Sequence, residues 1–249
     1  MADWNDNRTR PGLGTSQSFT GVSVPRTGEV FDAGLRRHML SIYNYMTSGV
    51  LLTGLVAMLF ARSGMAYSVM TSGLGIVVML APLAIVFAMS FGQNRFGKGT
   101  LQAMFWAFAV LMGMSLSTIF LVYTGSSIAA TFFATAGAFA GLSLFGYTTK
   151  KDLSAMGTFL IMGVVGLIIA MVVNMFLKST GLDLAISFLG VLIFAGLTAY
   201  DTQRLKAQYS QLRGTELAAK AIILGALSLY LDFINMFLFL LRFMGNSRS

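Results

Sequence analysis

Two aspartates lie inside long apolar segments of this sequence, where a charged side chain is costly. Asp232 is near the middle of "ALSLYLDFINMFLFLLRF", and Asp201 lies in "GLTAYDTQRLK", at the start of a basic cluster. A carboxylate at the centre of a bilayer costs roughly 2.5–3.5 kcal/mol on insertion scales. Because ionisable groups inside membranes normally face a bundle interior or a wet cavity, the two aspartates are the first candidates for chemistry.

Each aspartate has polar residues one helical turn away, on the same face of its segment. Two polar stripes on consecutive segments predict that each stripe provides the other's environment. Simpler interpretations stay open, namely a local Asp201–Arg204 ion pair and a neutral Asp232 that hydrogen-bonds within its own segment. The candidate supporting groups are Thr198 and Arg204 around Asp201, and Ser228 and Asn235 around Asp232.

Two carboxyls in a poorly solvated site cannot both ionise cheaply, because they repel each other and lose hydration. A shared proton would join the two segments and bring the carboxyl oxygens of Asp201 and Asp232 to about 2.5–3.0 Å from each other. Without that proton the pair would attract a cation, and Ca²⁺ prefers such oxygen ligands. Two carboxylates alone bind weakly, which suits passage better than storage. We therefore expect transient calcium at this pair and no other cofactor.

The composition indicates the elements that must position these groups. Of 249 residues, 56% are hydrophobic and 10% are charged, whereas soluble domains carry about 25% charged residues. Seven apolar segments are each long enough to cross about 30 Å of hydrocarbon, which predicts an all-α multi-pass protein in the lipid bilayer. We expect Pro82 to kink the second segment, and small residues such as Gly137 and Gly141 to mark close helix contacts. The segments are 39–61, 67–91, 100–122, 127–147, 155–177, 182–204 and 221–243.

Residues 1–35 are polar and contain two of the three prolines, which predicts a flexible tail before a single transmembrane domain, 36–249. Ten basic residues flank the segments on the side of this tail and four on the other, so we expect a cytoplasmic N-terminus and an external C-terminus. The basic residues form no continuous patch, which excludes a nucleic-acid-binding face. The absence of cysteine excludes disulfides and thiolate metal sites.

Four stretches of the chain are similar to the Bax inhibitor-1 (transmembrane Bax inhibitor motif) family, on its bacterial branch. They are "SLSTIFLVYTG", "FGYTTKKDLSAMG" and the two segments that contain the aspartates. The resemblance implies six helices around a central seventh, a location in the bacterial inner membrane, and a role for Asp201 and Asp232 as a pH-responsive gate for calcium leak. Some members hold this pair with an arginine on the second helix. Here residues 67–91 contain no charged residue, and Arg95 is the nearest basic one.

Other functions that use buried aspartates or seven helices fit less well. An intramembrane aspartyl protease also needs two aspartates, but "LYLD" stands where a presenilin-type Gly-x-Gly-Asp is required, so we expect no enzymatic activity. A retinal-binding protein needs a lysine in the last span, and 221–243 contains none. One alternative stays open. Some bacterial family members look like non-transporting modulators of a membrane-anchored AAA protease that grips an N-terminal tail, and residues 1–35 would serve as that handle.

Overall fold

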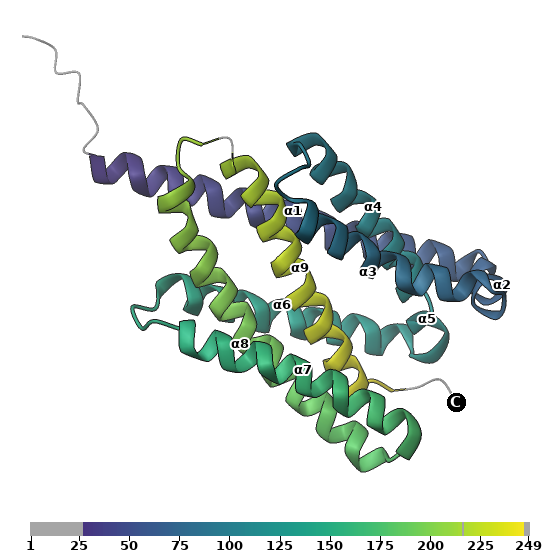
Figure 1. Ribbon diagram of the computed structural model, residues 1–249. Coiled ribbons are helices and arrows are strands. Elements are labelled where there is room, and N and C mark those ends of the chain that lie inside the picture. Colours follow the sequence, from purple (N-terminus) through teal and green to yellow (C-terminus); the bar gives the residue numbers. More distant parts are fainter. Residues whose placement is uncertain (1–26, 216, 247–249) are drawn as a thin grey trace, which may run out of the picture.

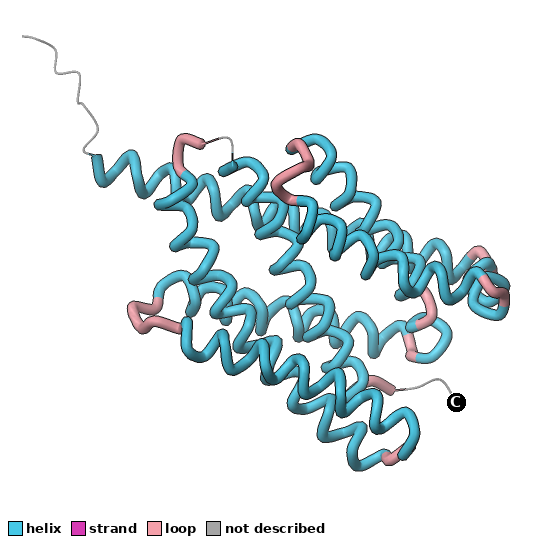
Figure 2. The backbone as a smooth tube through the Cα atoms, viewed as in Figure 1, coloured by secondary structure: helices cyan, strands magenta, loops and turns pink. Residues whose placement is uncertain are grey.

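The computed structural model describes residues 27–215 and 217–246, and each of its regular elements is an α-helix (Figures 1 and 2). Within these residues, seven helical stretches are long and apolar enough to cross a membrane, as the sequence predicts. The helices are α1 (Thr27–Arg62), α2 (Met65–Thr71), α3 (Leu74–Gly92), α4 (Lys98–Leu116), α5 (Ile119–Val122), α6 (Gly125–Thr148), α7 (Ser154–Leu177), α8 (Thr180–Leu212) and α9 (Leu217–Met244).

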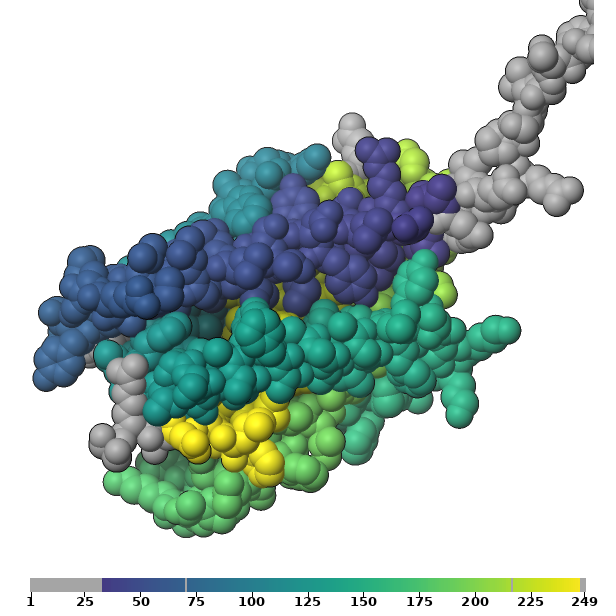
Figure 3. All heavy atoms as spheres, turned by 180° about the vertical axis from the view of Figure 1, so that it is seen from behind, coloured from purple at the N-terminus to yellow at the C-terminus, as the bar shows by residue number. Residues whose placement is uncertain are grey.

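The last helix, α9, is the centre of the bundle. In its most apolar stretch 67% of the residues are buried, compared with 11–39% in the other spans. It packs against α1, α4, α6 and α8, while α3 lies on α4 and α7 lies on α8 (Figure 1). From behind, α9 is visible between α1 and α6 (Figure 3). The expected central seventh helix is therefore confirmed.

The second span is interrupted, and not at its proline. Ser72 is extended between α2 and α3, whereas Pro82 lies inside α3. The Ser72 hydroxyl donates to the carbonyl oxygen of Val69 at 2.8 Å, and Gly73 follows it. A serine that bonds the preceding turn and a glycine both weaken a helix, so the expectation of one helix over 67–91 was wrong.

Both α1 and α8 extend beyond the predicted spans at one end of the bundle. α1 begins at Thr27, so 27–35 is helical and not part of a flexible tail, while residues 1–26 of that expected tail lie outside the described residues. α8 continues to Leu212. The two extensions touch, because Gly34 packs against the ring and hydroxyl of Tyr209. This contact supplies the burial that the polar sequence did not indicate.

One glycine allows a backbone-to-backbone approach beside the aspartates. A methyl group on Gly146 of α6 would collide with the backbone carbonyl of Ala199 on α8. In contrast, Gly137 and Gly141 face open space, so the prediction of close contacts at those two positions was wrong. Spacing alone does not say which face of a helix meets a neighbour.

Candidate functional site

The two aspartates lie at the interface of α8 and α9, with 7% of Asp201 and 5% of Asp232 exposed. The Ser228 hydroxyl of α9 donates a hydrogen bond to Asp201 Oδ2. Ser228 is one turn before Asp232, so this bond sets the two carboxyls on facing sides of one helix pair. The basic group beside them is Arg204, whose Nη1 is 3.6 Å from Asp201 Oδ1.

Asp232 is the member of the pair whose hydrogen bonding is incomplete. Among the described residues, its Oδ2 is the one buried side-chain oxygen or nitrogen without a hydrogen-bond partner. The hydrogen bond across the helix pair comes from Ser228 to Asp201 Oδ2, and the direct carboxyl–carboxyl hydrogen bond stays a prediction. Leaving a buried polar atom unpaired is costly, and such exceptions in a folded protein call for a functional explanation.

Of the four predicted supporting groups, the structure brings Arg204 and Ser228 to Asp201. The other two bond to their own helices. The Thr198 hydroxyl donates to the Phe194 carbonyl at 2.8 Å, and the Asn235 amide donates to the Leu231 carbonyl at 2.8 Å. Both use the carbonyl four residues earlier, which is a common local alternative for short polar side chains in helices.

The residues that follow Asp201 anchor α8 to its neighbours, a role that sequence reasoning missed. The Thr202 hydroxyl bonds Ser143 of α6 at 3.3 Å. The Gln203 side chain bonds two backbone groups of the α6–α7 connection, at 2.8 and 2.9 Å. Lys206 Nζ donates to the Tyr147 carbonyl at 2.7 Å. The signal was present as a cluster of polar residues after Asp201, interrupted by Leu205, but its partners are distant in sequence.

Two cavities approach the carboxyl pair from opposite ends of α9. One, of about 340 Å³, lies near the connection of α8 to α9 and is lined by Arg204 and Gly225 among others. The other, of about 310 Å³, is lined by Asn235 and other residues toward the end of α9. Residues 226–234, which contain Asp232, separate them. The helical rise makes this barrier about 15 Å long.

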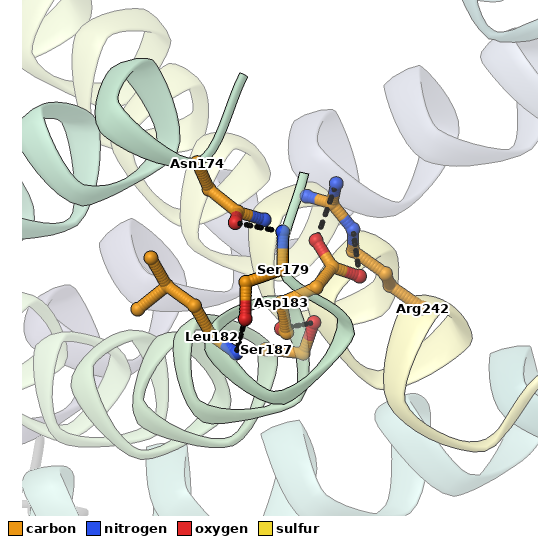
Figure 4. A network of polar contacts seen from close by, with 6 residues as sticks. All are labelled: Asn174, Ser179, Leu182, Asp183, Ser187 and Arg242. Carbon is orange, nitrogen blue, oxygen red and sulfur yellow. Dashed lines mark hydrogen bonds and ion pairs between the residues drawn. The ribbon is translucent and has the colours of Figure 1, made fainter. Parts of the chain in front are cut away.

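A second polar site joins the other ends of α8 and α9 (Figure 4). Arg242 Nη2 is 2.7 Å from Asp183 Oδ1, and Arg242 Nε donates to Asp183 Oδ2 at 3.1 Å. Next to this pair, the Ser179 hydroxyl accepts from the Leu182 backbone and caps α8. The sequence did not single out this pair, because each residue lies at the end of an apolar segment, where polar residues are ordinary. An antiparallel helix pair brings such flanks together.

Asp152, outside the membrane spans, is a contrasting acid. It is exposed on the α6–α7 connection, and hydrogen bonds from Ser154 lower the pKa of the Asp152 carboxyl. A lowered pKa keeps this carboxylate ionised throughout the neutral and mildly acidic range. Asp152 therefore serves as a control acid for experiments on the buried pair.

A seven-span helical bundle with two buried aspartates on its last two helices defines a polytopic membrane protein with an intramembrane carboxyl site. The family model described as "Inhibitor of apoptosis-promoting Bax1" matches residues 35–249. The chain therefore belongs to the Bax inhibitor-1 family.

Bacterial relatives resemble the chain over nearly its whole length. The inner membrane protein YbhL of Escherichia coli is 44% identical over 230 residues, which cover 90% of this chain and 98% of the relative. RP147 of Rickettsia prowazekii is 48% identical over 235 residues, covering 94% and 98%. The membrane protein SpyM3_0260 of Streptococcus pyogenes is 32% identical over 225 residues, covering 87% and 95%.

Proposed function

We propose that this protein is a pH-sensitive calcium leak channel of the bacterial inner membrane, gated by Asp201 and Asp232. The observation that carries the proposal is the buried, unpartnered Oδ2 of Asp232 on the central helix. It lies in the barrier between two cavities, each of which is large enough for water. A carboxyl in that position controls whether the barrier carries a charge.

The proposed closed state has one proton on the carboxyl pair. The hydrogen bond from Ser228 to Asp201 then holds α9 against α8. Loss of the proton leaves two carboxylates that repel each other and attract Ca²⁺ as the transported ion. In residues 27–215 and 217–246 no group of three or more acids, histidines or cysteines gathers. The carboxylates of Asp201 and Asp232, with the Ser228 hydroxyl and water, would thus bind calcium weakly enough to release it.

We propose that the cavity near Arg204 faces the cytoplasm, since most basic flanks lie at that end. A reporter inserted after Gly214, between α8 and α9, should then stay cytoplasmic. A reporter fused after Ser249 should be exported. A cytoplasmic C-terminal reporter would contradict this orientation.

The function is tested with purified protein in liposomes that contain a calcium indicator, across roughly pH 5–8. The wild type should conduct calcium more as the pH rises, since deprotonation charges the pair. Asp232→Asn should conduct less and lose the pH dependence, because one carboxylate is gone and the other has no like charge beside it. Asp152→Asn is the matched control and should behave as the wild type. Equal flux in the wild type and Asp232→Asn would refute the gate.

The same assay separates the leak channel from the regulatory alternative, in which an AAA protease grips the tail. Deletion of residues 1–26 should leave calcium flux intact if the transmembrane domain conducts. If the protein only modulates a protease, liposomes should show no flux with or without these residues, and the deletion should abolish the effect on the protease in cells.

A further inference from the structure

A further cavity lies on the side of the bundle, away from the barrier. It is a groove of about 840 Å³ between α1 and α6, which both pack against α9. In the view from behind, α9 is visible at its floor (Figure 3). Its volume falls in the range of about 300–1,000 Å³ that is typical of ligand sites.

The groove is apolar along most of its length and basic at one end. Its walls and floor include Met46, Phe139 and Phe233, whereas Arg36 lies at the beginning of its α1 wall. Among the residues whose side chains the structure describes, no acidic one lines it. The helix from Arg36 to Leu51 is about 22 Å long, more than the roughly 15 Å hydrocarbon depth of one leaflet. An apolar chain that enters beside Arg36 could therefore stay in the groove through its leaflet.

Arg36 places an exposed guanidinium at this mouth. Among the described residues it forms no hydrogen bond or ion pair, and its side chain is exposed. A second cation is close, because Lys206 Nζ is bound to the carbonyl of Tyr147, another residue of the groove wall. Basic pockets between transmembrane helices bind the head groups of anionic lipids, and a guanidinium matches phosphate oxygens in a two-pronged contact.

We propose that this groove binds one acyl chain of an anionic phospholipid, with the lipid phosphate on Arg36. A neutral apolar ligand would fill the groove but would not use the positive charge of Arg36 and Lys206 at its mouth. The mouth is at the end where Gly34 meets Tyr209 of α8, so the lipid comes from the leaflet at the α8–α9 connection. This site is separate from the calcium leak, and its test measures lipid binding alone.

The lipid touches elements next to both aspartates. Ser143 lines the groove and bonds Thr202, the residue after Asp201. Phe233, the residue after Asp232, contributes to the groove as well. An acyl chain in the groove thus supports α6 and α9 directly beside the carboxyl pair.

The test is native mass spectrometry of the full-length protein. The protein is mixed with dioleoylphosphatidylglycerol or with dioleoylphosphatidylcholine, and the detergent is then removed. The two lipids have the same chains and differ in net charge. The wild type should retain the anionic lipid about fivefold better, which corresponds to about 1 kcal/mol for one arginine. Equal retention of both lipids by the wild type would overturn the proposal.

Two pairs of variants localise the site. Arg36→Gln should abolish the preference for phosphatidylglycerol, whereas Arg37→Gln, the neighbouring arginine outside the groove lining, should keep it. Ala140→Trp, which fills the groove, should reduce retention of both lipids, whereas Ala138→Trp on the same helix outside the groove lining should not. Equal effects within either pair would overturn the proposal. A dimer that only Ala140→Trp dissociates would assign the groove to a second copy of the chain and also overturn it.

Discussion

The helix pair α8–α9 carries acids at two sites, one at the far end of the pair and one inside it, and the two sites differ in how completely these acids are paired. At the far end, Asp183 and Arg242 form a two-pronged ion pair whose side chains are 31% and 44% exposed. Farther along the pair, Asp201 of α8 and Asp232 in the middle of α9 are buried, and among the described residues one oxygen of Asp232 has no partner. The complete pair needs no function beyond joining two helices. The Asp201–Asp232 pair breaks the rule that buried polar atoms are hydrogen-bonded. Exceptions to this rule concentrate at functional sites.

The two sites contribute to the stability of the fold with opposite signs and different sizes. A partly exposed ion pair contributes about 0.2–1 kcal/mol to stability, since water screens it and the side chains lose freedom. A buried polar group without a partner costs about 1–3 kcal/mol. The far end thus stabilises the fold slightly, while the carboxyl pair lowers the stability of the fold to keep a site that can change its charge.

The largest expected effect is on calcium flux. Asp201→Asn and Asp232→Asn should each reduce flux about tenfold or more, because half of the anionic ligands disappear. The double variant should add little, since both residues act in one site. Arg242→Gln, at the far end, should keep the pH dependence of flux. Additive effects of the two aspartates in the liposome assay would show that they have separate roles.

The next effect is on stability, and it has opposite signs at the buried carboxyl pair and at the far end. Asp232→Leu should raise the free energy of unfolding by about 1–3 kcal/mol, because the unpaired buried carboxyl is replaced by an apolar side chain. Asp183→Leu should lower that free energy, because Arg242 loses its partner. Thermal midpoints of both variants in the same detergent measure the difference. A loss of stability in Asp232→Leu similar to that of Asp183→Leu would mean that the Asp232 carboxyl is structural.

A comparable effect concerns how the carboxyl pair is held in place. Gly146→Ala should cost about 1–3 kcal/mol, since its methyl group would push α6 away from the Ala199 carbonyl beside Asp201. Gly137→Ala, on the same helix but facing open space, should change the thermal midpoint little. If both variants melt alike, the approach of α6 to α8 does not position the aspartates.

The smallest effect is the coupling at the far end. A double-mutant cycle with Asp183→Asn and Arg242→Gln should give an interaction energy of about 0.2–1 kcal/mol, which falls as salt is added. The thermal midpoints of the four proteins at low and high salt measure it. A larger coupling that is insensitive to salt would mean that the far end is buried in its native bilayer. The contrast between this ion pair and the buried carboxyl pair would then shrink.

The sequence alone determined the number of spans and, apart from the interrupted second span and the extended ends of α1 and α8, where they lie. Long apolar segments become helices in a bilayer because each backbone polar group must be satisfied within its own segment. The same logic identified Asp201 and Asp232, since two carboxyls in such segments are costly wherever the helices pack. It also identified Arg204 and Ser228 as their neighbours, because one helical turn separates residues on the same face.

Only the tertiary structure decided which of these groups meet. The rotation and depth of α8 and α9 bring Ser228 to Asp201, and turn Thr198 and Asn235 to their own helices. The Asp183–Arg242 pair and the groove between α1 and α6 likewise depend on residues far apart in the chain. Hydropathy is a property of each segment by itself, whereas these contacts depend on how helices turn against one another, and no local pattern in the sequence records that rotation.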